Sequence, residues 1–214
     1  MHQEHRTRAA LEAALAQAQP SPADAGTLEL IVRRPAIGKR DVLTLGHLDP
    51  LVGLIGDTWH QRGSSRTSDG APHPDMQINI MNSRVIALIA GDRSRWALAG
   101  DQLYVDLDLS AANLPPGTRL TIGGAVLEVT DQPHTGCGKF AERFGVDAMK
   151  FVNSPAGRQL QLRGINARVV TPGAIRVGDT VRKVTEIAEG TDVTPRNGAT
   201  EANEVTDPKI TTQA

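Results

Sequence analysis

The alternation of hydrophobic and polar residues along the chain predicts many short β-strands and few helices. Apolar side chains recur at every second position of residues 102–109, which is typical of a strand with one buried face. Two further runs flank Gly123-Gly124, a dipeptide that favours a tight hairpin turn. The expected strands are residues 28–32, 41–45, 76–81, 102–109, 119–122, 125–129, 167–170, 174–177 and 180–184. This pattern predicts a mainly β fold with a few short helices, arranged as a closed or nearly closed β-barrel.

Helical patterns occur in a few places between these strands. Residues 6–19 consist of strong helix formers, with Leu11 and Leu15 as a thin apolar stripe, and we expect an appended helix there. Residues 84–90 follow Ser83, a residue type that caps helices at their N-terminus, so we expect Ser83 to cap this helix.

Composition divides the chain into three parts. Residues 1–26 form an N-terminal helix and linker, and residues 27–184 form the body. Residues 185–214 hold six acidic and two basic residues, with no aromatic, leucine or methionine. Because such a segment cannot bury enough apolar surface to fold by itself, we expect a disordered tail that is dispensable for folding.

A polar stretch from residue 58 to residue 75 interrupts the succession of strands. A loop of this length without structure of its own is either a functional lid or simply mobile. Its basic and imidazole side chains are those of His60, Arg62, Arg66 and His73. We expect this loop to border the functional site as a lid.

The only cysteine of the chain, Cys137, lies in a glycine-flanked loop after a predicted strand. Gly136 and Gly138 can adopt backbone conformations that are closed to other residues. Residues 139–144 are predicted to form a short helix, and the partial positive charge at a helix N-terminus favours a thiolate. The positive charge of Lys139 also favours the thiolate form of Cys137. A nucleophile or a soft metal ligand is one interpretation, and a buried cysteine that acts as a small hydrophobe is the other.

Charge and cysteine content narrow the class of protein. The formal net charge is −1 with both signs mixed, so nothing indicates a nucleic-acid or membrane-surface protein. A single cysteine excludes an intramolecular disulfide framework and fits a reducing compartment. No apolar run is long enough to span a bilayer or to act as a secretory signal. We therefore predict a cytoplasmic protein without nucleic-acid or membrane partners.

With these elements in order, the chain resembles the MOSC family, which is named for the C-terminal domain of molybdenum-cofactor sulfurase. The similarity covers roughly residues 28–184 and depends on the order and spacing of several short motifs. These motifs are Gly53-Leu54-Ile55-Gly56-Asp57, Gly100-Asp101-Gln102-Leu103, residues 116–123, residues 125–130, Cys137-Gly138-Lys139, Arg143-Phe144-Gly145, residues 163–169 and residues 175–179.

The resemblance implies a MOSC-like β-barrel with one functional cysteine, which corresponds to Cys137. In relatives that bind molybdenum cofactor, this thiolate ligates the metal and basic residues hold the pterin phosphate. The candidates for cofactor binding in this chain are Lys39, Arg40, His134, Lys139, Arg163 and Arg168. Lys39 and Arg40 belong to a strand connection with four basic residues. The alternative interpretation of this connection is a solvated turn without a binding role.

Three functions remain open at this level. The first is binding of molybdenum cofactor through Cys137, with reduction of an N-hydroxylated small-molecule substrate by electrons from a separate reductase. The second is a sulfur carrier, in which Cys137 holds a persulfide received from a pyridoxal-phosphate-dependent cysteine desulfurase. The third is a zinc site with His134 and Cys137, for which a second close pair of ligands is missing.

Overall fold

The computed structural model describes residues 5–184, and the tail predicted for residues 185–214 lies outside the described residues. Seven strands of this part of the chain close into a barrel, in which β11 pairs with both β7 and β1. In barrel order the strands are β1 (Ala25–Arg33), β6 (Leu103–Asp106), β5 (Ile78–Asn82), β9 (Ile165–Thr171), β8 (Ala125–Val129), β7 (Arg119–Ile122) and β11 (Thr180–Val184). The predicted mainly β barrel is thus confirmed.

Two smaller groups of strands extend the barrel. Strand β2 (Asp41–Leu43) pairs with the end of β1. A three-stranded sheet contains β10 (Gly173–Arg176), β3 (Leu45–Asp49) and β4 (Gly53–Leu54). The predicted strand over residues 41–45 is therefore two strands, because the chain leaves β2 at Thr44 and joins a different sheet.

The interior of the barrel is built from the apolar positions of the alternating pattern. Leu28, Ile78, Leu120, Leu127 and Val181 come from five different strands, and all are fully buried. Burial of each such side chain stabilises the fold by about 1.5–3 kcal/mol. Strand β8 shows the alternation most clearly, with buried and half-buried residues in turn. This inward packing holds the ends of the strands, and the loops that follow them, in fixed positions.

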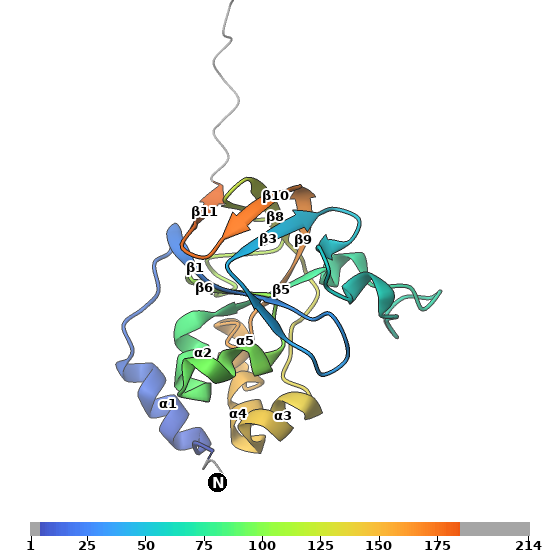
Figure 1. Ribbon diagram of the computed structural model, residues 1–214. Coiled ribbons are helices and arrows are strands. Elements are labelled where there is room, and N and C mark those ends of the chain that lie inside the picture. Colours follow the sequence, from blue (N-terminus) through green and yellow to red (C-terminus); the bar gives the residue numbers. More distant parts are fainter. Residues whose placement is uncertain (1–4, 185–214) are drawn as a thin grey trace, which may run out of the picture.

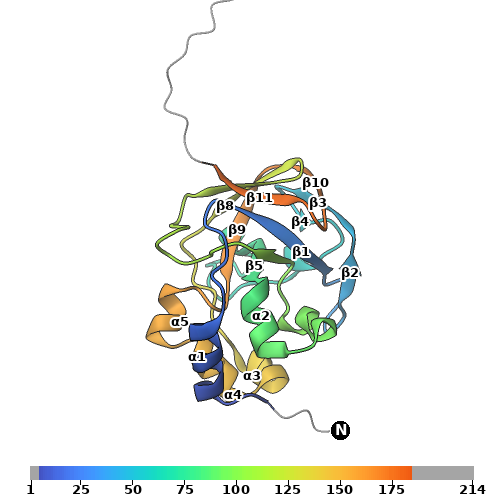
Figure 2. The same ribbon diagram turned by 90° about the vertical axis from the view of Figure 1, so that its left-hand side faces the viewer.

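Helices gather at one end of the barrel (Figure 1). They are α1 (Arg8–Gln17), α2 (Ser83–Ala90), α3 (Gly138–Phe144), α4 (Val146–Val152) and α5 (Pro155–Gln159). The described residues also hold three 3-10 helices: η3 (Arg93–Ala99) contacts α2, whereas η1 (Trp59–Gln61) and η2 (Pro74–Met76) belong to the connection between β4 and β5. The view in Figure 2 shows α1 beside α2 and α4, below the strands.

A second apolar core lies between the helices and the barrel. The three phenylalanines that follow the cysteine, Phe140, Phe144 and Phe151, are buried in it, so this segment packs firmly on the body. Leu11 of α1 is fully buried in the same core, so a thin apolar stripe is enough to anchor that helix. The division of the chain near residues 26 and 184 stays a prediction.

The connection from β5 to its parallel neighbour β6 carries α2 and η3, as parallel pairing requires a crossover. The expectation that Ser83 caps α2 is wrong. The cap is Asn82, whose Oδ1 accepts a hydrogen bond of 3.0 Å from the backbone N of Val85. Ser83 is the first residue inside the helix. Within residues 5–184, none of the helices is long and apolar enough to span a membrane.

Candidate functional site

Cys137 is the N-cap residue of α3 and its side chain is exposed. It has an extended backbone conformation, and its thiol makes no capping hydrogen bond to the helix. The thiol therefore remains available to the cavity of about 340 Å³ that Cys137 helps to line. This position excludes the interpretation of Cys137 as a buried hydrophobe.

The glycines around Cys137 act differently from the sequence-based expectation. Neither Gly136 nor Gly138 has a positive φ, so neither is needed for an unusual backbone conformation. Gly136 is needed for close packing, because a Cβ added there would lie 3.0 Å from Val152 Cγ2. Asn153 makes two hydrogen bonds to Gly136, both of 2.9 Å. Its Oδ1 accepts from the backbone N of Gly136, and its Nδ2 donates to the backbone O of Gly136.

The cavity at Cys137 is strongly basic. The β1–β2 connection, the loop after β4, the turn before β6 and α3 all contribute to its walls. Its lining includes six basic side chains: Arg34, Arg40, Arg62, Lys139, Arg143 and Arg163. No aspartate or glutamate lines it. Such a concentration of one sign of charge in a concave site attracts anions.

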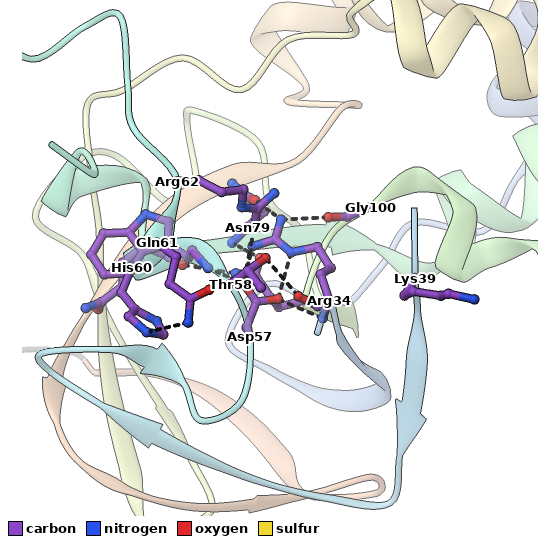
Figure 3. A network of polar contacts seen from close by, with 12 residues as sticks. Arg34, Lys39, Asp57, Thr58, His60, Gln61, Arg62, Asn79 and Gly100 are labelled. Atoms are coloured by element: carbon purple, nitrogen blue, oxygen red, sulfur yellow. Dashed lines mark hydrogen bonds and ion pairs between the residues drawn. The ribbon is translucent and has the colours of Figure 1, made fainter. Parts of the chain in front are cut away.

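Arg34 and Asp57 form the buried ion pair that supports one wall of this cavity (Figure 3). Arg34 Nε and Nη2 donate to the two oxygens of Asp57 at 2.8 and 2.9 Å, and Arg34 Nη1 donates to Asn79 Oδ1 at 3.0 Å. Burial alone would raise the pKa of the Asp57 carboxyl, but the hydrogen bonds and charge of Arg34 lower it below its ordinary value. Arg34 and Asp57 therefore form a rigid part of this wall, in which the guanidinium and the carboxylate are paired with each other.

A second buried ion pair joins Asp101 and Arg163. Arg163 Nη1 donates to both oxygens of Asp101, at 2.8 and 2.7 Å. His134 Nε2 lies 3.5 Å from Asp101 Oδ1, and His134 Nδ1 is buried without a hydrogen-bond partner in the described part of the chain. Burial lowers the pKa of His134 well below its ordinary value, and the charge of Arg163 acts in the same direction. The imidazole is therefore neutral and faces the Asp101 carboxylate.

Arg40 and Arg143 differ from the other three arginines that line the cavity, because no described carboxylate pairs with them. Both guanidinium groups approach Gly100, where a Cβ would lie 3.3 Å from Arg40 Nη2 and 3.8 Å from Arg143 Nη1. Burial lowers the pKa of Arg40, and the neighbouring charge of Arg143 lowers it further. Arg40 Nε is also buried without a partner within residues 5–184. These two side chains form an uncompensated cationic pair that an oxyanion would neutralise.

The structure brings together some of the residues that the sequence indicated. Arg40, Cys137, Lys139 and Arg163 all line the same cavity. His134 does not line it and lies behind it, where it faces Asp101.

Two of the sequence candidates are placed elsewhere. Lys39 is exposed, does not line the cavity, and points away from the network around Arg34 (Figure 3). Arg168 is on an outward position of β9, where its guanidinium pairs with Glu128 at 2.6 Å. The structure does not bring Arg168 to Cys137. Within residues 5–184 there is also no group of three or more His, Cys, Asp or Glu side chains that could hold a metal ion, so no zinc site forms around His134 and Cys137.

The loop over residues 58–75 does border the cysteine cavity, as expected for a lid. Thr58 and Arg62 line the cavity with Cys137. The loop has structure of its own, in contrast to the expectation, because η1 and the start of η2 lie within it. The loop projects from the side of the barrel between β4 and β5 (Figure 1).

Sequence reasoning missed several residues that shape the site. Arg34 belongs to the basic strand connection but is not among the candidates that the sequence indicated, although it makes five hydrogen bonds to Asp57, Asn79 and Gly100. No pattern in the sequence indicated that Asn79 and Asn153 contribute to the site. Their partners lie 17 or more positions away in the chain, so only the fold reveals the contacts.

Comparison with known proteins supports the architecture. The solved structure of the YUAD protein from Bacillus subtilis is similar, with a TM-score of 0.53 and 19% sequence identity over 73% of this chain and 94% of that chain. YiiM from Escherichia coli matches with a TM-score of 0.49 and 18% identity, over 77% of this chain and 73% of its own. At these identities the likeness to YUAD concerns the fold alone. No curated protein matches the chain.

The family assignment agrees with most of the motifs from which the resemblance was inferred, and the motif over residues 53–57 lies outside the matched stretch. The family model described as MOSC domain matches residues 73–182, which is more than half of the chain. This stretch includes Asp101, Cys137 and Arg163 of the site, together with the strands from β5 onward. The chain therefore belongs to the MOSC domain family.

Proposed function

We propose that this protein binds molybdenum cofactor with the Cys137 thiolate as a metal ligand and reduces N-hydroxylated substrates. The observation that carries this proposal is the exposed thiol of Cys137 in a cavity with six basic and no acidic side chains in its lining. A soft thiolate suits a transition-metal centre. Basic side chains suit the phosphate of a pterin cofactor.

The residues present fit such a group. Arg40 and Arg143 lie next to each other without a carboxylate partner among the described residues, and Arg40 Nε is buried and unpaired. A pair of like charges in a partly buried place is unfavourable until an anion binds between them. Arg40, Arg143 and Lys139 are thus the side chains of this chain that would hold the phosphate.

The remaining residues keep this site in shape. Arg34 is fixed by Asp57, and Arg163 is fixed by Asp101, so each guanidinium is held in a rigid position while the carboxylate offsets its charge. Asn153 holds the backbone just before Cys137. When bound, the cofactor supplies the two-electron redox chemistry, and these residues bind and orient it.

We propose that the electrons come from a separate reductase. The sequence has no G-x-G-x-x-G segment between a strand and a helix, which is the fingerprint of a dinucleotide-binding unit. The substrate would be a small molecule that enters the cavity beside Cys137. The loop over residues 58–75, which contributes Thr58 and Arg62 to the lining, would limit the size of that substrate.

The exposure of Cys137 also favours a second candidate, a sulfur carrier. In this case the thiolate attacks the terminal sulfur of a persulfide on a cysteine desulfurase. A new S–S bond forms on Cys137, and the thiolate of the desulfurase leaves. The pyridoxal phosphate that generates the persulfide would belong to the desulfurase.

One set of measurements separates the two candidates. The full chain and the Cys137→Ser variant are purified from a host that makes molybdenum cofactor, and metal and pterin are quantified together with the intact mass. We expect molybdenum and pterin near one per chain in the unaltered protein and neither in Cys137→Ser. Protein without molybdenum or pterin that gains the mass of one sulfur atom from a desulfurase would replace the first candidate with the second.

A further inference from the structure

Two acidic segments that follow the barrel in the chain share one sequence pattern. Residues 185–192, the proximal segment, and residues 200–207, the distal segment, both read T-E-x-x-E-x-T-D. Each segment therefore carries three acidic and no basic side chains. Both lie outside the described residues 5–184. The two segments have the same charge and differ chiefly in how far along the chain they lie from Val184, the last residue of β11.

The lining of the cysteine cavity is complementary in charge to such a segment. Six basic and no acidic side chains line this cavity. We refer to Arg40, Lys139 and Arg143 as its cationic cluster. Arg40 and Arg143 have no carboxylate partner in the described part of the chain, and Lys139 is exposed. Charges of one sign that are held together in a concave site attract ions of the opposite sign.

The two arginines of the cationic cluster also have unused hydrogen-bond donors. Each guanidinium has several N–H groups. Within residues 5–184, however, Arg40 donates only to the backbone O of Lys39, and Arg143 donates only to the backbone O of Leu98, each at 2.6 Å. The planar guanidinium matches the two oxygens of a carboxylate. Glutamate and aspartate side chains therefore suit the cationic cluster in geometry as well as in charge.

Only the distal segment is far enough from Val184 to reach the cationic cluster. Strand β11 ends at Val184 on the side of the barrel away from α3, the helix that Cys137 caps (Figure 1). An extended chain spans about 3.3 Å per residue, so the proximal segment extends at most about 26 Å from Val184, whereas Glu204 can lie up to about 65 Å away. A compact domain of about 180 residues has a diameter of roughly 40 Å. The distal segment can therefore pass around the barrel.

We propose that the distal segment occupies the cysteine cavity of the cofactor-free protein, with its acidic side chains on the cationic cluster. It offsets the like charges of Arg40 and Arg143 and covers the thiol of Cys137. Because the segment belongs to the same chain, its effective concentration at the cavity is on the order of millimolar, so a weak contact is sufficient. Displacement of the segment by the phosphate of the cofactor rests on the proposed function, whereas its binding to the cationic cluster does not.

The experiment compares two full-chain variants with the same change of charge. The distal variant carries Glu201→Gln, Glu204→Gln and Asp207→Asn, and the proximal variant carries Glu186→Gln, Glu189→Gln and Asp192→Asn. Both are purified from a host that makes no molybdenum cofactor, and inorganic pyrophosphate is titrated by calorimetry at low ionic strength. We expect the distal variant to bind pyrophosphate about fivefold more tightly than the unaltered chain, because a competing segment has been removed. The proximal variant should match the unaltered chain.

Alkylation of the only cysteine by iodoacetamide is the second measurement. Cys137 should react several-fold faster in the distal variant than in the unaltered chain, because the thiol is no longer covered. This difference should disappear in about 0.5 M salt, which screens exposed charges. It should also disappear when Arg143→Gln is added to both chains, because the cationic cluster is then incomplete.

The matched variants keep the inference separate from a general effect of charge and from the proposed function. Equal gains of pyrophosphate affinity in the proximal and distal variants would show that net charge alone acts, and would overturn the inference. No gain in the distal variant would overturn it as well, and would leave the proposed function untouched because neither measurement uses molybdenum. If the chain from a cofactor-producing host contains no molybdenum, the proposed function is contradicted, and a gain in the distal variant alone still supports the inference.

Discussion

Asn153 is hydrogen-bonded to both backbone polar groups of Gly136, the residue that precedes Cys137, with two distances of 2.9 Å. The amide side chain thereby pairs with the loop as a neighbouring strand would. Asn153 follows α4, whose Phe151 and Val152 are buried in the second core. The position of the thiol is thus determined by a side chain that does not line its cavity.

Asn153→Ala should change the behaviour of the cysteine more than the stability of the fold. Removal of the amide leaves the N–H and C=O of Gly136 without these partners, which should lower the free energy of unfolding by about 1–3 kcal/mol. The loop before Cys137 should then sample other positions. The rate of alkylation of the single cysteine by iodoacetamide should change several-fold, and the molybdenum content should fall.

Asn153→Asp is the matched variant for this test. Its carboxylate can still accept from Gly136 N, but its second oxygen is an acceptor that faces the acceptor oxygen of Gly136, so the alkylation rate and the molybdenum content should change in the same direction as in Asn153→Ala. If both variants unfold more easily while the alkylation rate and the molybdenum content stay unchanged, Asn153 has no part in the placement of Cys137.

The two glycines next to Cys137 should respond in opposite ways to alanine. At Gly136 a Cβ would lie 3.0 Å from Val152 Cγ2 and 3.3 Å from Asn153 Nδ2, so the loop must move away from α4. Overpacking of this kind costs about 1–3 kcal/mol. At Gly138 nothing lies within 4 Å, and alanine there favours the first turn of α3.

Urea unfolding of the two alanine variants provides the measurement. Gly136→Ala should be destabilised, and Gly138→Ala should be unchanged or more stable by up to about 1 kcal/mol. Equal losses at both positions would mean that the packing at Gly136 is not what requires a glycine there.

The barrel could be predicted from the sequence because its strands and turns are indicated by residues that are close to one another in the chain. The apolar–polar alternation of β8 and the glycine pair between β7 and β8 determine which residues face inward and where the chain turns. The break at Thr44 was missed, since both short strands have the same apolar character and differ only in the sheet that they join.

The candidate site could be predicted only in part, because its contacts join distant segments. Lys39 and Arg40 are neighbours in sequence and equally basic, yet only Arg40 lines the cavity. Arg168 was indicated by a motif of the family, but its position on β9 points it outward to Glu128. The single cysteine could be identified because its flanking residues are polar. Asp57 and Asn153 form hydrogen bonds with residues that are distant in the sequence and are brought close only by the fold.

Arg40→Gln should weaken anion binding without loss of stability. The substitution removes a cation that burial and Arg143 both disfavour, together with a buried N–H that has no partner in the described residues. The free energy of unfolding should therefore stay the same within about 0.5 kcal/mol or rise. The affinity for inorganic pyrophosphate, measured by calorimetry at fixed ionic strength, should fall about tenfold.

Arg168→Gln is the control for Arg40→Gln. It removes the same charge from an exposed position whose pairs with Glu128 and Asp75 lie outside the cavity. Exposed pairs of this kind contribute about 0–1 kcal/mol. Pyrophosphate affinity should be unaffected, and an equal loss of affinity in both variants would show that net charge rather than the cavity determines anion binding.

Asp57 should account for part of the loss of stability in acid. The pKa of Asp57 in the folded protein lies below its ordinary value of 3.8, because the hydrogen bonds and charge of Arg34 outweigh the effect of burial. A carboxyl group with a lowered pKa binds its proton more weakly in the folded state than in the unfolded state. Its contribution is therefore complete above the unfolded pKa and is lost as the pH falls from about 4 toward the folded pKa.

Asp57→Asn tests this linkage. At neutral pH the variant leaves the Arg34 guanidinium buried without its carboxylate, which should lower the free energy of unfolding by about 3–5 kcal/mol. The difference between the unaltered protein and Asp57→Asn in urea unfolding should shrink as the pH is lowered from 5 to 3. Asp69→Asn alters an exposed carboxylate of the loop that follows Asp57 and should retain the full pH dependence. If the difference between the unaltered protein and Asp57→Asn is the same at pH 5 and pH 3, the Arg34–Asp57 pair does not contribute to acid sensitivity.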